Sequence, residues 1–266
     1  LDTELFHIEA LGSYESSRLN VNGSASFDET KINTEQNNLE DDLVELNTTS
    51  GELDAEYRVS PKFSFSVGVH YDETEYRTFK NLFSDRATTA YPLSVYYDMT
   101  PKLDLILGYT YSTTEIEGRN SFGGLFDPVS SYEQDTDFFN IGLRGNISTK
   151  LTGFFKIGYR TVSAGDTNLT NAGVLVDRIE RNDRDMFGLD ASLTWMATSK
   201  LLYQLALSRD YNTGGLGEAT EVTRANLVGN YSFSTHWSGM ANLGYTDTDS
   251  YYLSRENEQF TGGLRI

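Results

Sequence analysis

Side chains that could do covalent chemistry are few in this sequence, and the best placed of them surround His70. The stretch from Ser64 to Asp72 carries two serines, one histidine and one aspartate at alternate positions, the residue types of a Ser–His–acid hydrolase. Positions i and i+2 of an extended strand lie about 7 Å apart, too far for direct hydrogen bonds between their side chains. Catalysis would need partners from neighbouring strands. We therefore expect no enzyme and no catalytic residues.

Metal and nucleic-acid chemistry also find little support. Cysteine is absent, which excludes thiolate metal sites and disulfide frameworks. Acidic clusters such as Glu40–Asp42 offer oxygen ligands, but none has the D-x-D-x-D-G spacing of a calcium loop, and solvated loop charge is the simpler interpretation. The 39 acidic residues outweigh the 21 Lys and Arg, for a net charge of −18, which disfavours phosphate binding. We predict no metal, no cofactor and no nucleic-acid partner.

Charged side chains recur instead on one face of alternating segments, where they could line an aqueous pore. The predicted pore-lining residues are Glu52, Asp54, Glu56, Arg58, His70, Asp72, Asp98, Asp104, Arg144, Lys156, Arg160, Asp190, Asp210, Arg224 and Arg265. An open lumen with opposed acidic and basic walls would orient polar solutes and filter them by size and charge. Alternatively, these charges pair across a narrow or plugged lumen. The sequence leaves both interpretations open.

The elements that carry these residues are strands, because hydrophobicity alternates with a period of two along the whole chain. From Leu103 to Tyr111, leucine and tyrosine occupy one face, and Asp104 begins the other. We count about thirteen such segments, each near the length that a tilted strand needs to cross a bilayer. No stretch approaches the roughly 20 consecutive apolar residues of a spanning helix.

Turns and aromatic residues indicate a membrane barrel. Short turns of one type, such as Ser60-Pro61-Lys62 and Thr100-Pro101-Lys102, alternate with longer polar loops near 29–42, 78–87, 117–133 and 165–181. Aromatic residues fall near both ends of the segments, with aliphatic residues between them, as in the two girdles of a membrane barrel. The core of a soluble β-sandwich, the alternative, has no reason to sort its rings in this way.

We therefore predict an all-β fold, a closed antiparallel up-and-down transmembrane β-barrel. About thirteen strands are visible of about fourteen to sixteen in the whole barrel. Residues 1–266 would form a single outer-membrane domain that is truncated at both ends. The reason is parity, since such barrels start in the periplasm with an even strand number, whereas the first visible strand runs towards a short turn. We expect the short turns to be periplasmic and the long loops extracellular.

The repeated unit of an aromatic strand, a T-P-K-L or S-T-K-L turn and a strand ending in G-Y resembles the beta-barrel porin 2 family. The segments 100–111 and 144–160 carry this resemblance most clearly, and 255–264 is similar to a late strand of that family. Members of the family accompany exopolysaccharide synthesis and export systems, which implies passage or anchoring of secreted polysaccharide. The resemblance also implies sixteen strands and brings no catalytic residues.

We thus expect a porin-like conduit of a Gram-negative outer membrane, for exopolysaccharide export. The alternative is a structural or adhesive surface barrel with an occluded lumen, a scaffold or receptor without transport. Expected partners are outer-membrane lipid, secreted polysaccharide or an export-system protein. The sequence does not define the oligomeric state.

Overall fold

The computed structural model describes residues 5–33, 43–80, 83–118, 131–171, 174–179, 183–213, 219–234, 237–250 and 255–265. All its regular elements in these ranges are strands. They are β1 His7–Glu15, β2 Leu19–Asn33, β3 Leu43–Ser60, β4 Phe63–Tyr76, β5 Arg86–Thr100, β6 Leu103–Ile116, β7 Tyr132–Asn146, β8 Leu151–Ala164, β9 Thr167–Asn171, β10 Val174–Ile179, β11 Arg184–Met196, β12 Leu201–Thr213, β13 Ala219–Ser232, β14 Ser238–Ser250 and β15 Arg255–Arg265. Within the described ranges no helix is long and apolar enough to cross a membrane.

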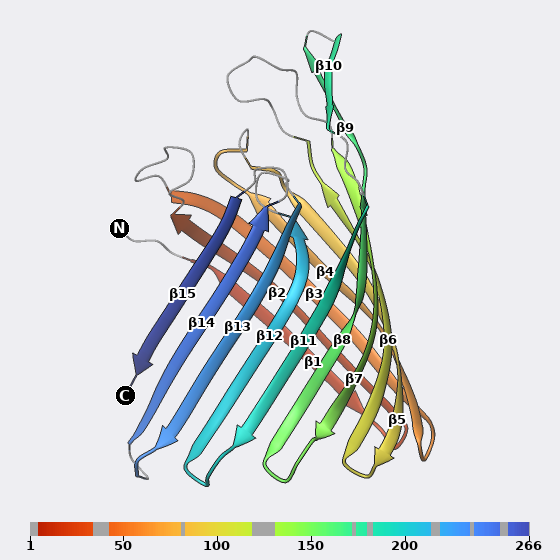
Figure 1. The fold of residues 1–266 in the computed structure, drawn as a ribbon, viewed down its shortest axis with the longest axis vertical. Helices are drawn as coiled ribbons and strands as arrows, with labels where there is room; N and C mark the ends of the chain where they lie inside the picture. The colour runs from red at the N-terminus through yellow and green to blue at the C-terminus, as the bar shows by residue number, and fades with distance from the viewer. Residues whose placement is uncertain are drawn as a thin grey trace.

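Thirteen of these strands form one antiparallel sheet in which each strand pairs with its neighbour along the chain. The only step in the numbering is from β8 to β11, because β9 and β10 form a separate two-stranded ribbon. The sheet curls so that β1–β4 form one wall and β11–β15 the wall that faces it (Figure 1). The predicted antiparallel up-and-down architecture and its visible strand number are confirmed. The sheet edges are β1 and β15, and closure of the barrel stays a prediction.

Side-chain alternation separates an apolar outer surface from a polar interior. On β6, Leu107 points outward and is 54% exposed, whereas Ile106 beside it faces the interior and is buried. Aromatic rings on the outer surface pair across neighbouring strands near both ends of the sheet. Trp195 stacks on Tyr203 at 5.6 Å near the short turns, and Tyr109 lies 4.7 Å from Phe139 further up. This arrangement agrees with two aromatic girdles around an aliphatic band.

The short turns share a hydrogen bond that explains their repeated sequence. In each, the hydroxyl of a serine or threonine accepts a hydrogen bond from a backbone N–H two or three residues further on. The Oγ atoms of Ser60 and Ser148 accept from Phe63 and Leu151, both at 3.1 Å. Thr100 and Thr198 accept from the following lysines. These turns all lie at one end of the sheet (Figure 1).

The opposite end carries the longer connections. The polar loop expected near 165–181 differs from the prediction, since its described residues form the β9–β10 ribbon rather than an irregular loop. After β4 the chain turns back over the sheet, where Phe83 stacks on Tyr76 at 4.8 Å and packs against Val44. The predicted loop around 117–133 lies mostly outside the described residues.

Candidate functional site

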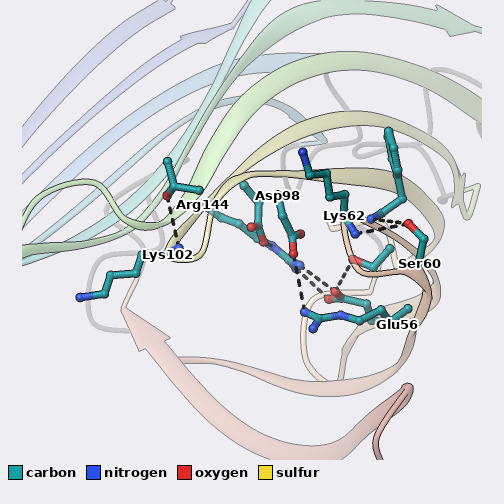
Figure 2. Close-up of polar contacts among 11 residues, drawn as sticks. Glu56, Ser60, Lys62, Asp98, Lys102 and Arg144 are labelled. Carbon is teal, nitrogen blue, oxygen red and sulfur yellow. Dashed lines mark hydrogen bonds and ion pairs between the residues drawn. The ribbon is translucent and has the colours of Figure 1, made fainter.

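The polar centre nearest the short turns is built around Arg144, which projects into the interior from β7. Its Nη1 and Nη2 atoms donate to the two carboxylate oxygens of Glu56, both at 2.7 Å, and its Nε donates to Asp104 at 2.9 Å. The guanidinium lies over the ring of Tyr96, 3.4 Å from its centroid. Ser64 donates a further hydrogen bond to Glu56 at 2.8 Å. We call these five residues the Arg144 cluster (Figure 2).

The Arg144 cluster joins distant parts of the sheet. Glu56 lies on β3 and Arg144 on β7, and the strands β4, β5 and β6 separate them in the hydrogen-bonded order. The contact therefore crosses the concave interior. Gly145, directly after Arg144, has a φ of +116°, and a Cβ at this position would lie 2.3 Å from the Lys102 carbonyl oxygen. A glycine is required where β7 approaches the β5–β6 turn so closely.

A cavity of about 750 Å³ lies in the interior, lined by side chains from β3 to β8 and from β11 to β13. We call it the central chamber. Seven of the predicted pore-lining residues line it: His70, Asp72, Lys156, Arg160, Asp190, Asp210 and Arg224. Its remaining lining is rich in threonine, serine, asparagine and glutamine. The strand alternation thus brings nearly half of the predicted set to one cavity.

Most ionic groups of the central chamber are paired with each other. Arg160 donates to Asp210 at 2.7 Å and lies over the ring of Phe138, 4.2 Å from its centroid. Lys156 lies 4.0 Å from Asp190 on the adjacent strand. Of the two interpretations left open by the sequence, paired charges describe these contacts, yet the chamber between them is not filled by side chains.

The other predicted residues lie elsewhere on the interior face. Glu52 and Asp54 line a smaller cavity of about 380 Å³ against β1 and β2. Arg58 lies 4.0 Å from Asp98 near the short turns. Arg265 is placed near the end of β15, opposite Met240. That these fifteen residues line a conducting pore stays a prediction.

The serine, histidine and aspartate around His70 are divided among different partners. His70 Nε2 contacts the carboxylate of Asp54 at 3.0 Å, from the neighbouring strand, and the chamber lining adds Asp72 separately. Ser64 bonds to Glu56, and Ser66 lies 3.1 Å from the Tyr96 hydroxyl. In the described part of the chain these contacts assemble no Ser–His–acid relay. No group of three or more His, Asp or Glu side chains there is placed to hold a metal ion.

Several interior residues were missed by the sequence prediction because they carry no charge. Tyr96 supports Arg144, and Gln134, Thr136 and Asn140 line the central chamber. Their position in the strand alternation is the signal that would have found them. The prediction weighed charge above hydrogen-bonding capacity.

A curled antiparallel sheet with a polar interior and an outer surface of aliphatic and aromatic side chains defines an integral outer-membrane β-barrel. The family described as "Putative outer membrane beta-barrel porin, MtrB/PioB" matches residues 6–262. The chain belongs to this family of outer-membrane porins. The match supports a porin, while the beta-barrel porin 2 name and its link to exopolysaccharide stay predictions.

Similar solved structures agree on the fold. The ferric yersiniabactin uptake receptor FyuA from Yersinia pestis is 12% identical with a TM-score of 0.50, covering 98% of this chain and 48% of that one. The chain thus spans about half the length of FyuA. The translocator domain of the autotransporter NalP from Neisseria meningitidis is 13% identical with a TM-score of 0.49, covering 94% and 88% of the two chains. No curated protein sequence matches the chain.

Proposed function

We propose that this porin is a passive, non-enzymatic conduit for polar solutes across the outer membrane, with its short turns in the periplasm and its long loops outside. The observation that carries this proposal is the central chamber, whose lining of hydroxyl, amide and paired ionic groups suits a water-filled path. The outward apolar band would contact outer-membrane lipid.

Secreted exopolysaccharide is the cargo that we propose within this class, together with an export-system protein as its periplasmic partner. A hydrophilic polymer needs a path without apolar walls, and the chamber lining is compatible with that need. Deletion of the gene should lower the exopolysaccharide recovered from the culture medium, and re-expression should restore it. Unchanged secretion in the deletion strain would exclude this cargo.

Swelling of proteoliposomes in neutral sugars of graded size tests the conduit itself. A conduit lets small sugars enter quickly and larger ones progressively more slowly, so swelling rates should fall with solute size. Equal swelling of protein-containing and empty vesicles would instead indicate the occluded scaffold. The Arg144–Glu56 contact across the interior favours this second candidate function, because it narrows the path near the short turns.

A further inference from the structure

We propose that the central chamber is a binding site for a neutral, polyhydroxylated solute of the sugar class. This inference rests on the proposed conduit, since the chamber lies on its path, and it adds a place where the solute is held. The cavity volume of about 750 Å³ falls within the usual range for small-molecule sites, which is about 300–1,000 Å³.

Buried amide oxygens in the chamber wall have unused acceptor capacity. Gln134 is only 3% exposed, and its Oε1 atom has no hydrogen-bond partner among the described residues. The Oδ1 atom of Asn140, on the same strand, is also buried without a partner there. Buried polar atoms are normally paired, so two unpaired acceptors in one wall point to a ligand that donates hydrogen bonds.

Hydroxyl groups surround these acceptors. Thr88 and Thr114 lie side by side on β5 and β6, with their Oγ1 atoms 2.9 Å apart, and Thr136 is buried beside Gln134 on β7. Each hydroxyl can both donate and accept a hydrogen bond, which matches the hydroxyls of a sugar. Pro92 adds apolar surface to the same wall, against which a C–H face of a sugar ring could lie.

The ionic groups favour a neutral ligand over a charged one. Arg160 and Asp210 already bond to each other at 2.7 Å, and Lys156 lies 4.0 Å from Asp190. An ionic solute would have to displace one partner from each pair that it contacts, and leaving a partly buried charge unpaired is costly. A neutral polyol can bond to the amides and hydroxyls without breaking these pairs.

Titration calorimetry on the folded protein in detergent micelles tests this site with maltotriose as the probe. Triethylene glycol, a polyether with few donors, and glycine betaine, a zwitterion, are the comparison solutes. Maltotriose should bind saturably, and both comparison solutes should not. Gln134→Leu should weaken maltotriose binding about fivefold, the effect of one lost hydrogen bond. Thr136→Val should weaken it in the same direction and serves if Gln134→Leu fails to fold.

Gln204→Leu is the matched control, because Gln204 faces the interior from β12 but does not line the chamber. Its affinity for maltotriose should equal that of the unchanged protein. Absence of saturable maltotriose binding, binding by betaine alone, or equal affinity in all variants would overturn the site. The proposed conduit fails separately: maltotriose binding by a protein that passes no solute would keep the site, whereas solute passage without binding would remove the site alone.

Discussion

Arg144 and Glu56 meet across the interior of the sheet, 88 positions apart in the chain, through two parallel hydrogen bonds of 2.7 Å each. A guanidinium matches a carboxylate in this geometry, and paired bonds of this kind are among the strongest hydrogen bonds in proteins. Neither side chain is more than about a third exposed. The contact therefore ties two opposed parts of the curled sheet together near the short turns.

A double-mutant cycle should detect this tie. Glu56→Gln and Arg144→Met should each lower the free energy of unfolding by about 1–3 kcal/mol, because each leaves a partly buried charged partner unsatisfied. The double variant should lose clearly less than the sum of the two. Urea unfolding in lipid vesicles, followed by tryptophan fluorescence, measures all three values. Glu56→Gln combined with Arg209→Met, on the outer face of β12, should be additive, and strict additivity in the first pair would contradict a direct contact.

The assignment of inner and outer faces predicts opposite effects at neighbouring positions on β14. Leu243 is 63% exposed on the outer face, so Leu243→Arg should place a cation in the lipid and cost about 2–4 kcal/mol near the bilayer centre. Asn242→Arg points to the interior and should fold normally. Heat-modifiable migration on gels reports the folded fraction. Similar folding of the two variants would mean that the register of β14 is wrong.

Orientation in the membrane can be tested by labelling, since the chain has no native cysteine. Val174→Cys lies on the exposed β9–β10 ribbon at the long-loop end and should react with a membrane-impermeant maleimide on intact cells. Thr149→Cys and Ser199→Cys lie in short turns and should react only after the outer membrane is broken. Reversed labelling would place the long loops in the periplasm.

Ion selectivity should follow from the pairing of charges in the central chamber. Because Lys156 lies beside Asp190, the unchanged protein should discriminate weakly between cations and anions. Asp190→Asn removes one negative charge and should shift the reversal potential in a KCl gradient towards anions. The shift should shrink at 1 M salt, where the Debye length is about 3 Å. Asp249→Asn, on the exposed outer face of β14, is the control and should leave the reversal potential unchanged.

The strands and their faces could be predicted from the sequence because alternation is a local property. Leu107 and Ile106 are separated by that rule alone, and so are the charged residues of the central chamber. The short turns were also readable, since Ser60 and Ser148 start them for a local reason.

The contacts within the interior could not be predicted, because they depend on how strongly the sheet curls. Nothing near Arg144 in the sequence indicates that Glu56 is its partner, and alternation gives a face but no partner across it. The β9–β10 ribbon was expected to be an irregular loop, because its segment is polar and short. Uncharged residues such as Gln134 were overlooked since their role depends on burial rather than on charge.

Single-channel recording in planar lipid bilayers tests the central claim, that this porin is an open conduit, most directly. The folded protein should insert and produce discrete current steps of uniform size, because the central chamber offers ions a polar path. A variant such as Arg144→Ala, which removes the contact with Glu56, should give larger steps. Folded protein that inserts into the bilayer, verified by heat-modifiable migration, and passes no current in either form would contradict the conduit and identify the barrel as an occluded scaffold.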